Sequence, residues 1–347
     1  MHKNTKRILT ALFFIAACAA AYFIIVRGQN NKNASTQIFA MDTYMELTAY
    51  GKNSEDAVRA AKEEIERLDA LLSTGNEKSE ISQLNKNKKG QISADTQYLL
   101  NRSLTIYEET DGAFDITIYP VMKAWGFTGE EHWIPDEEEL QDLLQLVDAS
   151  RLQYDANTQT LTLPEKVEID FGGIAKGYTS QRVAQIMQEY DITSAILNLG
   201  GNVQLVGARP DGSSWKVAIK SPDEQEEYLG VLSAKNKAII TSGGYERYFE
   251  ENGRKYHHII DPKTGMPAYN GLQSVTIVSE DGTLADGLST ALYVMGTEEA
   301  VKFWQDHNDE FDAILYTDDG TLYVTEGIAD TFTSSHSITV LEKAVAF

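Results

Sequence analysis

The segment Asp170-Phe-Gly-Gly-Ile-Ala-Lys-Gly177 most constrains what this chain can fold into. Paired glycines permit a tight turn and let the backbone approach a ligand closely. The residues before it, Val167 to Phe171, predict a strand, and the apolar spacing after it, through Tyr190, predicts a helix. A helix that begins there would present unpaired N–H groups to an anion. The segment matches neither common nucleotide-binding glycine loop, so an ordinary strand-to-helix connection remains open.

A second segment, Ala285-Asp-Gly-Leu-Ser-Thr290, could supply oxygen ligands to a cation. Asp286, Ser289 and Thr290 are spaced i, i+3 and i+4, which places them on one helical face. Carboxylate and hydroxyl oxygens are ligands that Mg²⁺ accepts, although a helix cap with incidental hydroxyls has the same pattern. The metal interpretation needs a further ligand, such as a backbone carbonyl of the glycine turn. Together the two segments predict chemistry on a pyrophosphate.

Two adjacent histidines, His257 and His258, precede the turn Asp261-Pro-Lys-Thr-Gly265. In a strand their rings face opposite sides, so at most one enters a shared site. An imidazole at a strand end can transfer protons near neutral pH. A structural imidazole bonded to the backbone is the equally open alternative.

Three other segments contain glycines at which a ligand could approach the backbone. They are Asp111-Gly-Ala-Phe-Asp115, Asn198-Leu-Gly-Gly-Asn202 and Thr241-Ser-Gly-Gly244. The first could line a flat aromatic ligand, or it could be a helix C-cap with a core phenylalanine.

The apolar patterns predict an α+β fold, with helices packed on largely antiparallel sheet. Alternation over Phe39–Tyr50 predicts one half-buried strand, with Phe39 on the buried side. The sequence also predicts helices over 54–72, 135–147, 285–295 and 298–306, and one more helix that ends at residue 110. It predicts a loop over 73–85, and hairpins over 152–163 and at 210–212, 252–253 and 318–320.

The N-terminus has the pattern of a targeting segment. Three cations precede an apolar run from Ile8 to Val26, which is followed by a polar linker, Gln29 to Gln37. Ile15-Ala-Ala-Cys18 looks like a bacterial lipoprotein cleavage box and holds the single cysteine. A lipid on Cys18, an uncleaved membrane helix and a secreted product remain open, and each places the folded part outside the cytoplasmic membrane. We therefore divide the chain into residues 1–35 and a domain over 36–345.

The charge of the chain restricts its partners. The formal net charge is −22, and the first 35 residues hold five cations and no acid, so the folded part is still more anionic. Such a surface repels phosphate, which excludes nucleic acid as a partner. A phosphate ligand would need a metal and local donors.

Taken in order, these segments resemble the ApbE family, the FAD:protein FMN transferases, over about Ile38 to Glu342. The blocks that carry the resemblance are Met41-Asp-Thr43, Ser73-Thr74 to Glu80-Ile-Ser82, Thr110–Asp115, Ile169–Gly177, Leu199-Gly-Gly201, Thr241-Ser-Gly243, His257–Gly265 and Asp286–Thr290.

The resemblance implies an ApbE-like (T-fold-like) domain with FAD and Mg²⁺ in a central cleft. It implies Mg²⁺-dependent transfer of FMN from FAD to a Thr or Ser hydroxyl of a partner protein, an acceptor that belongs to a membrane redox complex, with release of AMP. Carried over by position, FAD would contact Met41, Gly75, Ala113, Phe114, Asp115, Asp170, Lys176 and the Ile260 backbone. The Gly173 carbonyl, Asp286, Ser289 and Thr290 would hold Mg²⁺, and His258 would be the base.

The chain departs from the family pattern at three positions. Gly75 stands where the family usually has an aromatic residue, which leaves one stacking contact unaccounted for; Asn202 and Gly244 replace residues that are often acidic or polar. Two alternatives stay open: a Mg²⁺-dependent FAD pyrophosphatase, in which water is the acceptor, and a flavin-binding surface protein without turnover.

Overall fold

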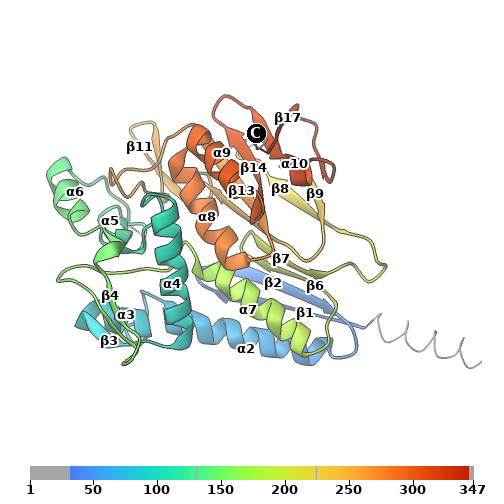
Figure 1. Cartoon of the computed structure of the whole chain (residues 1–347), viewed down its shortest axis with the longest axis horizontal. Coiled ribbons are helices and arrows are strands. Elements are labelled where there is room, and N and C mark those ends of the chain that lie inside the picture. Colours follow the sequence, from blue (N-terminus) through green and yellow to red (C-terminus); the bar gives the residue numbers. More distant parts are fainter. Residues whose placement is uncertain (1–31, 130, 224, 344–347) are drawn as a thin grey trace, which may run out of the picture.

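In the computed structural model, which describes residues 32–129, 131–223 and 225–343, a nine-stranded sheet runs through the molecule (Figure 1). Its strands, in spatial order, are β1 (Asn33–Ala40), β2 (Thr43–Tyr50), β6 (Ser194–Leu199), β7 (Asn202–Gly207), β10 (Ala238–Gly243), β13 (Leu272–Ser279), β14 (Phe311–Thr317), β15 (Leu322–Thr325) and β17 (Ile338–Leu341). Neighbours pair antiparallel, except for the parallel pair β15–β17. The prediction of a largely antiparallel α+β fold is confirmed.

Three small sheets complete the strands of the described chain. They are β8 (Trp215–Lys220), β9 (Tyr228–Ala234) and β16 (Phe332–Thr333); β11 (Tyr248–Glu251) with β12 (Arg254–His257); and β3 (Lys89–Gln91), β5 (Thr160–Thr162) and β4 (Gln153–Asp155). The first of these packs on one face of the large sheet through an apolar cluster that includes Trp215, Leu232 and Ile239.

Helices α2, α7, α8 and α9 cover the opposite face of the large sheet (Figure 1). The helical segments are α2 (Ser54–Leu72), α3 (Glu80–Asn87), α4 (Ala94–Glu109), η1 (Ile116–Ile118), α5 (Tyr119–Ala124), α6 (Glu137–Leu144), η2 (Ala149–Arg151), α7 (Ala175–Glu189), α8 (Gly282–Met295), α9 (Thr297–Asp306) and α10 (Glu326–Ala329). α2 buries Val58, Ala61 and Ile65 against the first strands, as the helical spacing predicts. α8 is buried on nearly every side because it packs on β10, β13, α4 and α7.

The predicted single strand over Phe39–Tyr50 is wrong: this stretch belongs to a hairpin. β1 and β2 are joined by the two-residue turn Met41–Asp42, in which both residues have positive φ (49° and 58°). The buried positions are therefore even-numbered before the turn and odd-numbered after it, and Phe39 faces solvent instead of the core. β1 begins at Asn33, within the segment Gln29–Gln37 that the sequence analysis assigned to a polar linker.

Three other local predictions are also wrong. The predicted loop over 73–85 contains the start of α3, which Ser79 caps by accepting from the N–H of Ser82. Residues 167–171 form no strand; the backbone N–H and carbonyl of Ile169 are instead bonded by the side chain of Asn85 in α3. The turn at 210–212 connects strands of two different sheets, whereas the hairpins around 155–157, 252–253 and 318–320 are confirmed.

The proposed N-terminal anchor lies outside the described residues. In the three described ranges, no helix is both long and apolar enough to cross a membrane.

Helices α7 and α8 contact each other through glycines. A Cβ atom added at Gly177 of α7 would lie 2.2 Å from the carbonyl oxygen of Gly282 and 2.5 Å from the Cβ of Asp286 in α8. Only a residue without a side chain lets the two backbones approach this closely.

Replacing Gly177 by alanine should therefore push α8 away from α7. We expect Gly177→Ala to lower the free energy of unfolding by about 1–3 kcal/mol, the usual cost of overpacking, measured by urea denaturation. Gly129→Ala is the matched control, since a Cβ there meets no atom within 4 Å. Equal stability of the two variants would contradict the tight crossing.

Candidate functional site

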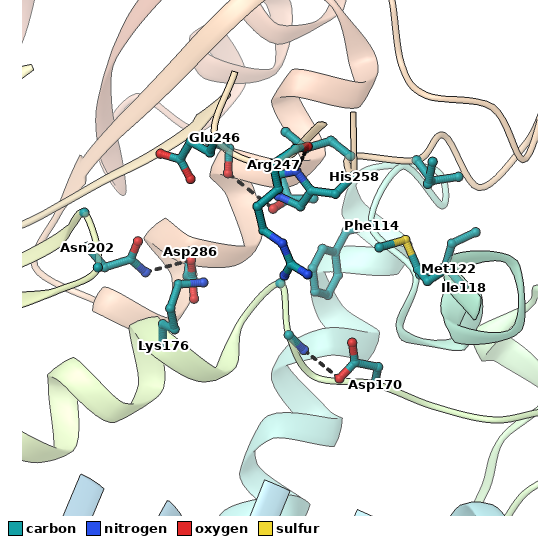
Figure 2. Close-up of a pocket in the computed structure, with 18 of the residues that line it drawn as sticks. Phe114, Ile118, Met122, Asp170, Lys176, Asn202, Glu246, Arg247, His258 and Asp286 are labelled. Atoms are coloured by element: carbon teal, nitrogen blue, oxygen red, sulfur yellow. Dashed lines mark hydrogen bonds between the residues drawn. The ribbon is translucent and has the colours of Figure 1, made fainter. Parts of the chain in front are cut away.

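A cavity of about 640 Å³ opens where the ends of several strands meet the start of α7 and the middle of α8. Figure 2 shows its walls, which come from segments far apart in the sequence. Most of the predicted site residues line it, namely Met41, Ala113, Phe114, Asp115, Asp170, Gly173, Lys176, His258, Ile260, Asp286 and Thr290. The two segments on which the sequence analysis depended therefore face one cavity.

The Asp286 carboxylate joins three elements at the base of the cavity. Its Oδ2 accepts from the backbone N–H of Gly177 (2.7 Å), and its Oδ1 accepts from Nδ2 of Asn202 (2.9 Å). The Gly177 N–H belongs to the first turn of α7, whose N–H groups lack partners within the helix. The Gly177 N–H, one of the helix N-terminal donors that we expected to bind an anionic ligand, therefore already bonds this buried carboxylate.

The predicted hydroxyl ligands separate into two groups. Thr290 lines the cavity beside Gly173, where an added Cβ would lie 3.7 Å from Thr290 Oγ1. The Ser289 hydroxyl is fully buried behind the wall and donates to the backbone carbonyl of Asp286 (2.8 Å). Ser242, at the end of β10, takes the position facing the cavity; its Oγ lies 2.8 Å from Ser289 Oγ and 3.4 Å from Thr290 Oγ1.

This donor set is suited to a hard divalent cation. It offers one carboxylate, Asp286, with the neutral oxygens of Thr290 and Ser242 and the Gly173 backbone nearby. In the described part of the chain, no three His, Cys, Asp or Glu side chains gather as a metal site. Mg²⁺ commonly binds one or two carboxylates and takes its other ligands from water and substrate phosphate. The residues therefore fit Mg²⁺ better than a soft metal such as Zn²⁺.

The side chains of the two histidines point to opposite sides of the backbone at the end of β12, as the strand geometry predicts. His257 is buried, and its Nε2 is 3.0 Å from the carbonyl oxygen of Ala268. His258 faces the cavity, and its Nδ1 is 3.1 Å from the carbonyl oxygen of Arg247. Because a carbonyl only accepts, Nδ1 carries the hydrogen and the lone pair of the neutral ring lies on Nε2.

Both imidazoles remain neutral at physiological pH. Burial, followed by the nearby guanidinium of Arg247, lowers the pKa of His258 to about 3. Burial lowers the pKa of His257 to about 4. His258 is therefore present as a free base throughout the physiological range.

Two predicted FAD-binding carboxylates differ in what they bind. The Asp115 carboxylate accepts from the backbone and hydroxyl of Thr117 (2.7 and 2.6 Å) and from the N–H of Ala149 (3.1 Å), so it fixes the loop that begins η1. Asp170 Oδ1 accepts from the N–H of Gly172 (3.1 Å), inside the glycine turn. Burial raises the pKa of both carboxyl groups.

Gly75 does not line the cavity, although the resemblance assigned it to FAD. It is exposed, and its N–H donates to Ser73 Oγ (3.2 Å) in the loop before α3. Met41, Ala113 and Phe114 instead form the apolar wall.

Three charged side chains of the cavity lining were missed from the sequence. Lys220, Glu246 and Arg247 line the cavity, and Arg247 extends towards Phe114 while its Nη2 donates to the carbonyl of Phe127 (2.7 Å) (Figure 2). Burial raises the pKa of Glu246, while Lys176 and Lys220 oppose the shift. Glu246 and Arg247 directly follow the Thr241–Gly244 segment, so extending that segment by three residues would have found them.

Comparisons with known proteins agree with this geometry. The sequence model of the ApbE family matches residues 41–315. A protein of Haemophilus influenzae called FAD:protein FMN transferase is 31% identical over 285 residues, covering 79% of this chain and 82% of its own. A Vibrio cholerae protein of the same name is 33% identical over 262 residues, covering 74% and 78%.

Solved structures show the same fold. The crystal structure of the ApbE protein from Thermotoga maritima superposes with a TM-score of 0.80 at 31% identity, covering 85% of this chain and 98% of that one. The flavin transferase ApbE from Vibrio cholerae gives a TM-score of 0.78 at 26% identity, covering 86% and 99%.

Proposed function

Because the chain belongs to the ApbE family, we propose that it transfers FMN from FAD to a Thr or Ser hydroxyl of a partner protein and releases AMP. The observation that carries this proposal is the meeting of Asp286, Thr290, Gly173 and His258 at one cavity. A volume of about 640 Å³ lies within the range of pockets that enclose small ligands and cofactors.

The base in this proposal is Nε2 of His258. It takes the proton of the acceptor hydroxyl as the hydroxyl oxygen forms a bond to the FMN phosphorus. The bond between that phosphorus and the bridging oxygen breaks, and AMP leaves with the electron pair. Such displacements need placement and charge neutralisation more than covalent help from the protein.

The charge neutralisation has two sources. Lys176, Lys220 and Arg247 bring three cations to the cavity of an otherwise anionic chain. Mg²⁺ held by Asp286, Thr290 and Ser242 with the Gly173 carbonyl would withdraw charge from the pyrophosphate oxygens. Ser289 would support this site from behind by fixing Ser242.

Removing the base should separate binding from transfer. We expect His258→Ala to retain FAD and to lose about 10²- to 10⁴-fold in transfer rate, measured by the mass gain of the acceptor. Since a neutral His258 is needed and its pKa is about 3, its protonation should cause no loss of wild-type rate between pH 8 and pH 5. An alanine variant with the wild-type rate, or an inflection near pH 6.5 that disappears in it, would contradict the assignment. Free FMN and AMP without a mass gain in the wild-type reaction would instead indicate a pyrophosphatase.

Removing a metal ligand should change the requirement for Mg²⁺. We expect Asp286→Ala to abolish the metal dependence, and Thr290→Val to raise the Mg²⁺ concentration for half-maximal rate by about tenfold or more. Thr290→Val keeps the side-chain shape, so it also serves if Asp286→Ala does not fold. Thr333→Val, on the exposed face of β16, is the matched control. If both site variants showed the wild-type dependence on Mg²⁺ concentration, the proposal that this face of α8 binds the metal would be contradicted.

The N-terminus supports a location at the outer face of the cytoplasmic membrane. Its three cations and apolar run suit either a membrane helix or a lipid on Cys18, and either would hold the enzyme near a membrane redox subunit as acceptor. Mass spectrometry of the mature N-terminus should show a diacylglyceryl group on Cys18 or an intact residue 1 in the membrane fraction. An unlipidated N-terminus after residue 18 in the soluble fraction would contradict both.

A further inference from the structure

Two large aromatic side chains stand in solvent at the tip of the β1–β2 hairpin. Phe39 is 63% exposed and Tyr44 is 80% exposed, the largest exposures among the bulky apolar residues of the described chain. The two residues are cross-strand partners, and their rings meet edge to face with centroids 5.0 Å apart. Resting on the proposed function, we propose that this pair, the Phe39–Tyr44 pair, docks the acceptor protein beside the hydroxyl that receives FMN.

The position of the pair connects it to the reaction. The turn that Phe39 and Tyr44 flank is Met41–Asp42, and Met41, Asp42 and Thr43 all line the cavity. A protein that places a Thr or Ser hydroxyl in the cavity must therefore rest its neighbouring surface on the rim. Phe39 and Tyr44 do not line the cavity themselves, but they flank the turn that does, so the pair is the apolar surface next to it.

The hairpin tip is fixed in place, although it is exposed. The N–H of Met41 donates to Asp69 Oδ1 (3.0 Å), and the Thr179 hydroxyl reaches Met41 Sδ (3.7 Å). Thr43 packs so closely on the β6–β7 turn that a Cβ at Gly200 would lie 2.2 Å from Thr43 Oγ1. Aromatic side chains on a rigid platform lose little entropy on binding and are frequent interface anchors.

Neither ring of the Phe39–Tyr44 pair packs into the core of the protein. Further along the same face, Tyr50 lies against Trp215 of the small sheet, with centroids 6.1 Å apart, but that cover does not extend to the hairpin tip. Single exposed aromatics are common on protein surfaces, whereas two in mutual contact beside a cavity form a local apolar patch.

The surrounding charge indicates the chemistry of the partner. Residues 33–50 contain two acids, Asp42 and Glu46, and no lysine or arginine. Both acids are exposed beside the pair. The complementary surface is a polypeptide segment with an apolar side chain and at least one lysine or arginine close to the modified Thr or Ser.

The test compares transfer with FAD binding in the full-length chain. The acceptor is a protein that the wild-type chain modifies with FAD and Mg²⁺, with its modified residue mapped by mass spectrometry. We expect Phe39→Ser/Tyr44→Ser to lower kcat/KM for the acceptor about 10- to 100-fold through KM, with an unchanged Kd for FAD. Phe39→Tyr/Tyr44→Phe should retain the wild-type value. Tyr228→Ser is the matched control, since Tyr228 is 47% exposed on β9 and does not line the cavity.

A photocrosslinking amino acid at position 44 gives a second measurement that does not depend on the folding of the double variant. It should capture the acceptor, whereas the same amino acid at position 228 should not. A wild-type KM in the double variant would overturn the docking inference, as would equal crosslinking at the two positions. It would also be overturned if the double variant lost binding to anionic lipid vesicles but kept its transfer activity. If the wild-type chain modifies no protein and only releases FMN and AMP, the proposed function fails first, which is a distinguishable result.

Discussion

The buried carboxylate of Asp286 is the interaction on which the rest of the site depends. It bonds the first turn of α7 through Gly177 and the start of β7 through Asn202, so one side chain sets the mutual position of α7, α8 and the large sheet. Its place is possible because Gly177 and Gly282 let the two helices touch backbone to backbone. The same contact that closes the core therefore fixes the distance between the glycine turn and the oxygen-bearing face of α8.

Much of the site could be predicted because its residues lie in short segments with strong local patterns. The glycine turn at 172–173, the i, i+4 pair Asp286 and Thr290, and His258 at a strand end each have a local pattern, and the fold places them around one cavity. The orientation of Ser289 could not be predicted, because a hydroxyl three residues after a helical carbonyl can turn back to it. Gly75 was assigned by resemblance alone, and its loop lies away from the cavity. The hairpin turn was missed because Met-Asp is not a common sequence for two residues with positive φ.

The cavity gathers three cations, although its lining also holds five acids, Asp42, Asp115, Asp170, Glu246 and Asp286. Three cations come from α7, β8 and the segment after β10, while the carboxylates of Asp115 and Asp170 are occupied by backbone N–H groups. An anionic ligand would thus meet positive charge only after it passes an acidic surface. Long-range attraction cannot account for its entry, and short-range donors must supply the favourable free energy.

The partner of His258 is a backbone carbonyl and not a carboxylate. An imidazolium formed there would have no counter-ion, and Arg247 and Lys176 would both repel it. The charged ring would be a strong acid with a short lifetime, and it would give its proton back to solvent or to the departing phosphate between turnovers. In the proposed reaction the side chain would therefore carry the proton only transiently, without the stable ion pair that a carboxylate–histidine dyad would keep.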